Sequence, residues 1–226
     1  QKQDPVINFE QYLLDEKVIT NVDIEQLKLG FKLEINKAFD EASKEDKITF
    51  CAKDEVKDLF AKSEFKLTVP SELKKEMRLV DSISDGLKEA MKKHDNLVLM
   101  GQDIGDYGGV FKVTEGFVEE FGRDRVRNTP LCESAIVGAS LGLSIKGQKA
   151  MMEMQFSDFA TCGFNQIVNN LAKIHWRWGQ NADVVVRMPT GAGVSAGPFH
   201  SQSIEAWFTH VPGLKVVYPA FPHEAK

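Results

Sequence analysis

The chain has 226 residues, 42% of them hydrophobic and 27% charged, with a formal net charge of −5 and a pI near 5.6. This composition is that of a soluble globular protein with one domain of about 150 residues and an extension. The acidic balance provides no basic face for nucleic acid or acidic lipid. No apolar run approaches the roughly 18 residues that span a bilayer, so we expect neither nucleic acid nor membrane as a partner.

The three cysteines, Cys51, Cys132 and Cys162, are odd in number and widely spaced, without a Cys-x-x-Cys pair. This pattern indicates a reducing compartment, which we take to be the cytoplasm, and argues against a disulfide framework or a zinc site. We therefore expect three thiols that only pack. The chain begins without Met or a targeting pattern and stops where a helix would begin, so both ends are expected to be cut.

Residues 1–78 carry 31 charged side chains, whereas the 148 residues that follow carry 30. Residues 1–46 are predicted to be helical, with a short piece at Phe9–Leu14 and a second helix capped by Asn21 or Asp23. Apolar residues recur along that second helix at three- and four-residue spacings, which predicts one buried stripe. Its members are Ile24, Leu27, Phe31, Ile35 and Phe39. Residues 47–78 are rich in Lys and Glu and are expected to form a connecting segment.

From Leu79 onward helices alternate with short apolar strands, which is typical of an α/β fold. Leu79–His94 is predicted to be an amphipathic helix. Five strands are predicted, at 96–100, 126–128, 150–156, 184–188 and 214–218, and a helix at 134–145. We expect residues 79–226 to form a doubly wound, mainly parallel sheet with helices on both faces, truncated at its C-terminus. The loops after the strands should then lie along one edge, where open sheets of this kind bind ligands.

Glu133 is the first candidate on that edge, because it stands between a predicted strand and a helix of small and aliphatic residues. Desolvating a carboxylate costs several kcal/mol, so it should have a partner; backbone amides at a helix N-terminus are the simplest one. The glycines that follow residue 100 do not match a dinucleotide or phosphate-loop motif, and tight turns suffice to explain them. Gly138 and Gly142, four residues apart, favour either tight packing within the domain or a subunit contact.

Several motifs occur in order and carry a resemblance to a known family. They include Gly101-Gln102-Asp103-Ile104-Gly105, Thr129-Pro130-Leu131-Cys132-Glu133, Glu153-Met154-Gln155-Phe156-Ser157-Asp158-Phe159, His200-Ser201-Gln202-Ser203 and His210-Val211-Pro212-Gly213. Residues 79–226 resemble the beta subunit of the thiamine-diphosphate-dependent, decarboxylating first component of 2-oxo acid dehydrogenase complexes. Residues 4–42 resemble the carboxyl-terminal tail of the alpha subunit of that enzyme, which implies a fused alpha-beta chain.

The resemblance implies roles for five residues. Glu133 would hydrogen-bond a ring nitrogen of the aminopyrimidine of thiamine diphosphate and so favour the tautomer that deprotonates the thiazolium. Leu131 would pack on the pyrimidine edge, although it could be a core leucine, and Gln155 would bond near it, although it could be a loop-capping amide. Phe159 falls where the family usually has a tyrosine, so stacking is kept but a hydroxyl is lost.

The last of the five is His200, which lies after the glycine-rich stretch 191–197 and before a helix that Ser201 or Ser203 is expected to open. The resemblance implies that it acts beside the thiazolium in reductive acylation of the lipoyl group; on the residues alone, a surface capping histidine is the commoner case. His210 is expected to be a structural core histidine. Trp176 and Trp178, in a helix that ends at Gly179, are expected at an interface or in the core.

Nothing in the chain matches the Gly-Asp-Gly motif with a later Asn that holds the metal and the diphosphate in this family. We therefore expect no metal ligands here. Magnesium would come with an alpha-type diphosphate-binding domain, and this piece alone would be inactive. The resemblance implies further partners, namely a homo-oligomer or heterotetramer-like assembly and the lipoyl domain of the acyltransferase component.

Other readings stay open. The substrate could be a branched-chain 2-oxo acid or pyruvate, and acetoin dehydrogenase or a transketolase-type enzyme would share the fold and the glutamate. A ligand-binding α/β module without catalysis would not need Glu133. Residues 1–78 could serve only as an interaction scaffold.

Overall fold

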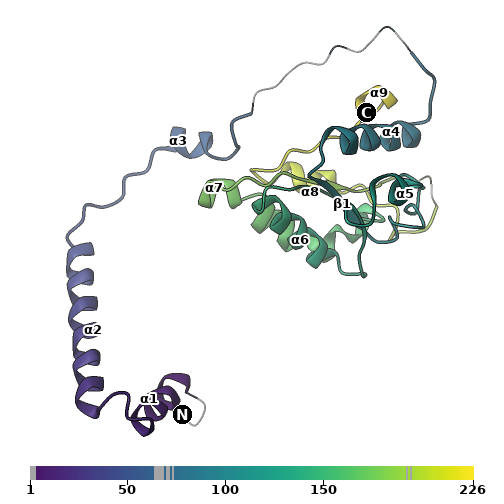
Figure 1. The fold of residues 1–226 in the computed structure, drawn as a ribbon. Helices are drawn as coiled ribbons and strands as arrows, with labels where there is room; N and C mark the ends of the chain where they lie inside the picture. Colours follow the sequence, from purple (N-terminus) through teal and green to yellow (C-terminus); the bar gives the residue numbers. More distant parts are fainter. Residues whose placement is uncertain (1–3, 64–68, 70–71, 73, 192, 194) are drawn as a thin grey trace. The chain divides into compact units, whose positions relative to one another are not determined.

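The computed structural model describes residues 4–63, 69, 72, 74–191, 193 and 195–226. These residues form two units, Gln1–Cys51 and Ala52–Lys226 (Figure 1). Parts of the predicted connecting segment 47–78 and of the glycine-rich stretch 191–197 lie outside the described residues, as do residues 1–3. The boundaries predicted at residues 46 and 78 stay predictions.

The described residues of the N-terminal unit contain two helices, α1 (Pro5–Asp15) and α2 (Asn21–Ala42). The Asp4 side chain accepts from two backbone amides and caps α1. Thr20 caps α2 in a capping box with Asp23, whose carboxylate accepts from the Thr20 amide at 2.8 Å. The predicted cap at Asn21 or Asp23 is therefore wrong: Asn21 is already helical, and Asp23 is the third helical residue, whose side chain accepts from the backbone amide of the cap residue Thr20.

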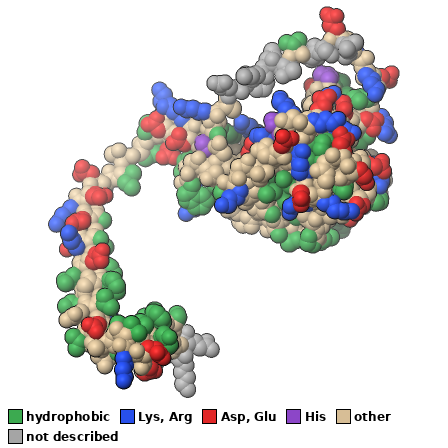
Figure 2. Space-filling view, in the orientation of Figure 1, with side chains coloured by type: hydrophobic (Ala, Val, Ile, Leu, Met, Phe, Trp, Pro, Cys, Tyr) green, Lys and Arg blue, Asp and Glu red, His purple; other side chains and the backbone are tan. Residues whose placement is uncertain are grey.

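The predicted buried stripe of α2 is also wrong for most of its length. Ile24 is buried, but Leu27, Phe31, Ile35 and Phe39 are 51–71% exposed. Hydrophobic side chains are accordingly visible along this helix in Figure 2. A helix with an uncovered apolar stripe gains little of the burial that usually stabilises helices. The periodicity therefore describes an apolar face suited to packing, which the described residues of the N-terminal unit leave largely exposed.

The second unit contains the sheet. Its elements are α3 (Ala52–Lys57), α4 (Leu79–Lys93), β1 (Leu97–Gly101), α5 (Phe117–Phe121), β2 (Val126–Asn128), α6 (Glu133–Ile145), β3 (Lys149–Glu153), the 3₁₀ segment η1 (Ser157–Gly163), the π-helical η2 (Gln166–Leu171), α7 (Ile174–Trp178), β4 (Val184–Arg187), α8 (Glu205–Thr209) and α9 (Pro222–Ala225). The strands are all parallel, in the order β2-β1-β3-β4. The parallel α/β sheet with helices is thus confirmed.

The fifth predicted strand, at 214–218, is wrong for this structure, which assigns no strand there. Val217 is 81% exposed, whereas Leu214 packs at the edge of the core. The apolar run thus has the composition of a strand but pairs with no neighbouring strand in this structure, and composition alone does not provide the hydrogen bonds between strands. The helix expected to open at Ser201 or Ser203 instead begins at Glu205.

Side chains alternate between two apolar clusters, one on each face of the sheet. Met100 and Met152 join the cluster that α6, η1, η2 and α8 cover. Leu99 and Met151 join the other, together with α4 and α5. Consecutive residues of a strand point to opposite faces, so the central strands β1 and β3 are buried on both sides, as a parallel sheet with two helical layers requires, whereas β2 and β4 at the edges are partly exposed.

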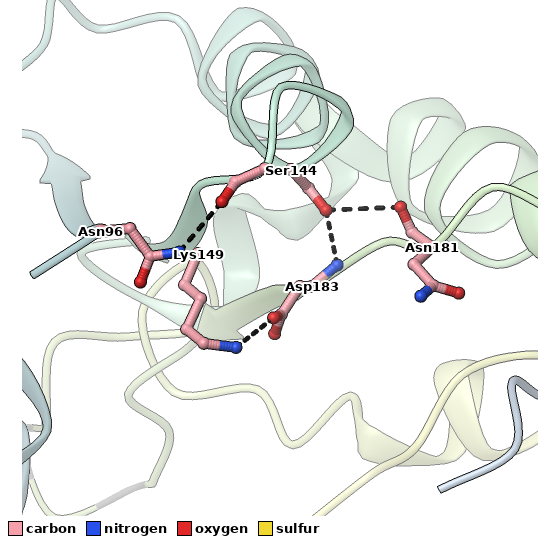
Figure 3. A network of polar contacts seen from close by, with 6 residues as sticks. Asn96, Ser144, Lys149, Asn181 and Asp183 are labelled. Carbon is pink, nitrogen blue, oxygen red and sulfur yellow. Dashed lines mark hydrogen bonds and ion pairs between the residues drawn. The ribbon is translucent and has the colours of Figure 1, made fainter. Parts of the chain in front are cut away.

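A polar network closes the amino end of the sheet (Figure 3). The Ser144 hydroxyl, at the end of α6, accepts from the Asp183 amide at 2.7 Å and donates to the Asn181 carbonyl oxygen at 3.3 Å. Lys149 at the start of β3 pairs with the Asp183 carboxylate. These contacts join α6 to β3 and β4 at the amino ends of the strands, and the carboxyl ends described below lie at the opposite edge of the sheet.

Several smaller expectations are corrected. All three cysteines are exposed and so are not packing thiols, and His210 is exposed and not a core histidine. A Cβ placed on Gly138 or Gly142 would meet nothing within 4 Å in the described chain, which removes tight packing within the domain as their explanation. Trp176 and Trp178 lie in α7, which ends at Gly179 as predicted, but they are 49% and 66% exposed. No helix in the described ranges has the length and apolarity to cross a membrane.

Candidate functional site

Glu133 is the first residue of α6 and lies at the carboxyl edge of the sheet, beside the end of β2. It is 7% exposed, and its Oε1 accepts from Nε2 of Gln102 at 3.2 Å. Its second oxygen has no hydrogen-bond partner among the residues that the structure describes. Cys132, the residue before α6, contributes no side-chain cap. The backbone amides of the helix therefore do not take up the carboxylate, and one oxygen stays available to a ligand.

Gln102 reaches Glu133 because β1 ends at Gly101 and the chain turns there. A Cβ on Gly101 would lie 2.8 Å from the carbonyl oxygen of Glu153, so only glycine allows β1 and β3 to approach this closely. Gln102 is 8% exposed and Asp103 has a φ of 58°. The Asp103 carboxylate accepts from Gln155 at 3.0 Å. The ends of β1 and β3 thus bring Gln155 to the same edge as the Gln102–Glu133 pair.

A buried ion pair lies at the ends of β3 and β4. Glu153 is 3% exposed, and its Oε2 is 3.1 Å from Nη2 of Arg187, whose side chain is 17% exposed. The contact is an ion pair without hydrogen-bond geometry, since these two atoms have no hydrogen-bond partner among the described residues. Burial raises the pKa of Glu153 and Arg187 partly offsets the rise, while burial lowers the pKa of Arg187. A Cβ on Gly109 would lie 3.2 Å from Glu153 Oε1, so the pair lies directly under the loop after β1.

His200 lies in a cluster of aromatic rings. Its imidazole is 5.0 Å from the Phe156 ring and 5.5 Å from the Phe159 ring, both edge to face. Phe111 contacts Phe156 from the loop after β1, at 5.8 Å between centroids. Three segments far apart in sequence therefore meet in this aromatic cluster, and within it the rings of Phe156 and Phe159 contact His200.

The predicted site residues fall into two groups, one around Glu133 at the start of α6 and one around His200. The segment η1 connects the two groups. A Cβ on Gly163, the last residue of η1, would lie 3.5 Å from the backbone oxygen of Glu133. Phe159 and Gln155 are half-buried, so each keeps an open face. Leu131 is 79% exposed, which excludes the alternative of a core leucine and leaves its predicted contact with a ligand as a prediction.

Two residues of the site were missed from the sequence. Gln102 occurs in one of the family motifs without a predicted role, although it is the donor to Glu133. Asp158 is 7% exposed and accepts from the backbone amides of Ser201 and Gln202. A signal was present for Gln102, because it directly follows the buried strand β1, and sheets of this kind bind ligands at the carboxyl ends of their strands. Asp158 lies within η1, five residues after the end of β3, and has no such signal.

Comparison with known proteins gives one family. Residues 75–226 match the model of the transketolase pyrimidine-binding domain. The 2-oxoisovalerate dehydrogenase subunit beta of Bacillus subtilis (strain 168) is 44% identical over 152 residues, which cover 66% of this chain and 46% of the relative. A pyruvate dehydrogenase E1 component subunit beta of Staphylococcus epidermidis is 41% identical over 153 residues, covering 67% and 47%. The chain thus spans about half the length of these curated relatives.

A solved structure gives the same fold. The chain described as "Split gene transketolase, inactive beta4 tetramer" matches with a TM-score of 0.51 and 19% identity, over 65% of this chain and 44% of that chain. At this identity the likeness concerns the fold alone. It agrees with the parallel sheet and the helical layers described above.

Proposed function

We infer the function from one premise: the chain belongs to the family of transketolase pyrimidine-binding domains, over residues 75–226. We propose that it supplies the pyrimidine half of a thiamine diphosphate site in a 2-oxo acid dehydrogenase, an enzyme that decarboxylates a 2-oxo acid and transfers the acyl group to lipoamide. The observation that carries the proposal is Glu133, a buried carboxylate with one oxygen bound to Gln102 and the other without a partner in the described chain.

The residues present fit the chemistry of the cofactor. The second oxygen of the buried Glu133, which has no donor among the described residues, suits a ring nitrogen that can donate a hydrogen bond, and a charge-assisted bond is strong where water is scarce. The half-buried ring of Phe159 offers a face for a planar heterocycle, and Gln155 offers an amide near the same edge. When bound, thiamine diphosphate supplies the electron sink that decarboxylation of a 2-oxo acid requires.

In this proposal each residue of the chain has a separate task. Gln102 donates to one oxygen of Glu133 and so leaves the other directed to the pyrimidine. Leu131 packs on the pyrimidine edge, and Phe159 stacks on its face. His200 exchanges a proton at the substrate side during acyl transfer, a task for which an imidazole near neutral pH is suited.

We propose that the remaining half of the site comes from an alpha-type domain. No group of three or more potential metal-binding side chains occurs in the described ranges, and the chain covers less than half of its relatives. The proposed partner carries magnesium and the diphosphate, and the proposed assembly is a homo-oligomer or resembles a heterotetramer. A lipoyl domain is the acyl acceptor. The N-terminal helices as an alpha-type tail, and a cytoplasmic location, are further proposals.

The substrate is proposed to be a branched-chain 2-oxo acid or pyruvate, because relatives of both names match at similar identity. A panel of 2-oxoisovalerate, pyruvate and acetoin on the assembled enzyme, with carbon dioxide and acyl-lipoyl product both measured, separates the choices. A transketolase-type enzyme would give no acyl-lipoyl product.

The proposal is tested first by binding. Thiamine diphosphate with magnesium is titrated into the chain alone and into the chain with its alpha-type partner, each as wild type and as Glu133→Gln. We expect tight binding only in the assembly. Glu133→Gln keeps the contact to Gln102 but should lower turnover by about a hundredfold or more. Tight metal-dependent binding by the chain alone would refute the divided site. Full turnover by Glu133→Gln would favour a ligand-binding module without catalysis.

A further inference from the structure

The loop that carries His200 is tied to the start of η1 by a buried carboxylate. Asp158 is 7% exposed, and its Oδ1 accepts from the backbone amides of Ser201 and Gln202, each at 3.2 Å. No cation lies within ion-pair distance of Asp158 in the described part of the chain. The carboxylate is therefore held by hydrogen bonds from these two amides, and a bond from an amide to a charged acceptor is stronger than one to a neutral acceptor.

Two hydroxyl groups hold the same loop from the other side. The Ser157 hydroxyl donates to the backbone oxygen of Gln202 at 3.0 Å, and the Thr190 hydroxyl donates to that oxygen at 2.8 Å. The Ser157 amide in turn donates to the Pro189 oxygen at 2.8 Å, which ties η1 to the chain just after β4. The hydrogen bonds that Asp158, Ser157 and Thr190 make to the loop all fall on the two residues that follow His200.

His200 itself is restrained by contacts of its backbone and of its imidazole. Its amide donates to the Gly197 oxygen at 3.2 Å, and its imidazole lies edge to face against Phe156 and Phe159. Phe156 and Phe159 flank Ser157 and Asp158 in the chain, so one short segment provides both the rings against the imidazole and the carboxylate under the backbone. A change in this segment would therefore displace the backbone and the imidazole of His200 together.

We propose that Asp158 is a positioning residue for His200, which fixes the backbone one and two residues after the histidine and thereby the place of its imidazole. The inference rests on the proposed function, because it gives His200 a task in acyl transfer. Asp158 itself acts only through the loop. Misplacing a reacting group by about 1 Å can cost a hundredfold in rate, so an anchor of this kind affects catalysis without touching a substrate.

The anchor is tested without an activity assay. Hydrogen exchange of the intact protein is followed by mass spectrometry in a peptide that spans residues 199–204. In the wild type the amides of Ser201 and Gln202 should be protected, and Asp158→Ala should speed their exchange by about tenfold to a hundredfold. Asp158→Asn keeps an accepting oxygen and should show a smaller effect. Asp183→Asn, which removes a carboxylate at the opposite end of the sheet, is the control and should change nothing in this peptide.

The role is tested in the assembled enzyme by acyl transfer to a lipoyl domain, measured beside the release of carbon dioxide with an artificial electron acceptor. Asp158→Ala should lower acyl transfer at least about tenfold and spare carbon dioxide release, and adding it to His200→Ala should lower transfer no further. Additive losses would overturn the positioning role. Unprotected wild-type amides would overturn the anchor even if Asp158→Ala does not fold. Undiminished transfer by His200→Ala would instead remove the proposed task of the histidine and leave the anchor standing.

Discussion

Removing Arg187 should destabilise the protein in a way that depends on pH. Arg187→Met leaves Glu153, which is 3% exposed, without its cation, and breaking a buried pair in this way costs about 3 to 5 kcal/mol. Glu153 can avoid the penalty only by taking up a proton. At about pH 8, protonating a carboxyl that ionises near 4.5 in the unfolded chain costs about 5 kcal/mol, and at about pH 5 it costs about 1 kcal/mol. These costs are upper limits on the penalty at each pH.

The sign follows from the direction of the shift. Burial raises the pKa of Glu153 and Arg187 opposes the rise, so the pKa rises further without Arg187. A group with a raised folded-state pKa contributes stability that is complete below its unfolded pKa and is lost as pH rises through the folded value. The stability difference between wild type and Arg187→Met should therefore grow from about pH 5 to about pH 8.

Urea unfolding at both pH values measures the difference, with Lys149→Met as the control. Lys149 pairs with Asp183 at the exposed end of the same two strands, so its loss should cost less than about 1 kcal/mol at either pH. Glu153→Gln should cost less than Arg187→Met at about pH 8, because the remaining guanidinium is 17% exposed and burial already favours a neutral Glu153. A penalty for Arg187→Met that is the same at both pH values would refute this reasoning.

Three further predictions concern single sites. Gly108→Ala should destabilise the protein more than Gly116→Ala in urea unfolding. Both glycines have a positive φ (+78° and +77°), which costs a non-glycine residue about 1 to 2 kcal/mol, but only a Cβ on Gly108 would meet a backbone atom, at 2.7 Å from Glu115 Cα. Equal losses for the two variants would contradict this. Phe159→Tyr should keep cofactor affinity in the assembled enzyme within a few fold and Phe159→Ala should weaken it about tenfold, as calorimetry would detect; unchanged affinity in Phe159→Ala would exclude stacking. Arg125→Ala should lower the free energy of unfolding by about 3 kcal/mol, because the guanidinium donates to three backbone oxygens at 2.7 to 3.1 Å. A loss below about 1 kcal/mol would mean that those hydrogen bonds do not stabilise the fold.

The sheet could be predicted from the sequence because short apolar runs between helices leave a direct signature, clearest in the central strands β1 and β3, which are buried on both faces. The predicted strands around Leu99, Val126, Met152 and Val186 are all present, the one at 126–128 with its predicted bounds and the others with boundaries shifted by at most three residues. The run at 214–218 has the same signature and forms no strand, because pairing depends on a neighbour that local composition does not describe. The same limit applies to α2, whose periodic apolar face lies uncovered over most of its length.

The candidate site was predictable as a set of residues but not as a set of contacts. Motifs pointed to Glu133 and His200, and the structure gives them Gln102 and the Phe156–Phe159 pair as neighbours. These contacts join segments 31 or more residues apart, which spacing alone does not reveal. His210 stands in an apolar stretch but directly follows the short helix α8 and is exposed, which average composition does not reveal either.

The alternation along β3 also makes the molecule easy to monitor. Met151 and Met152 are consecutive in the chain, yet their methyl groups belong to different helical layers, with Met91 in one and Met100 in the other. Isotope-labelled methionine methyls would therefore act as separate reporters on the two sides of the sheet. A ligand arriving beside α6 should perturb the signals of Met100 and Met152 first, and a shift at Met91 would reveal that the disturbance had crossed the sheet.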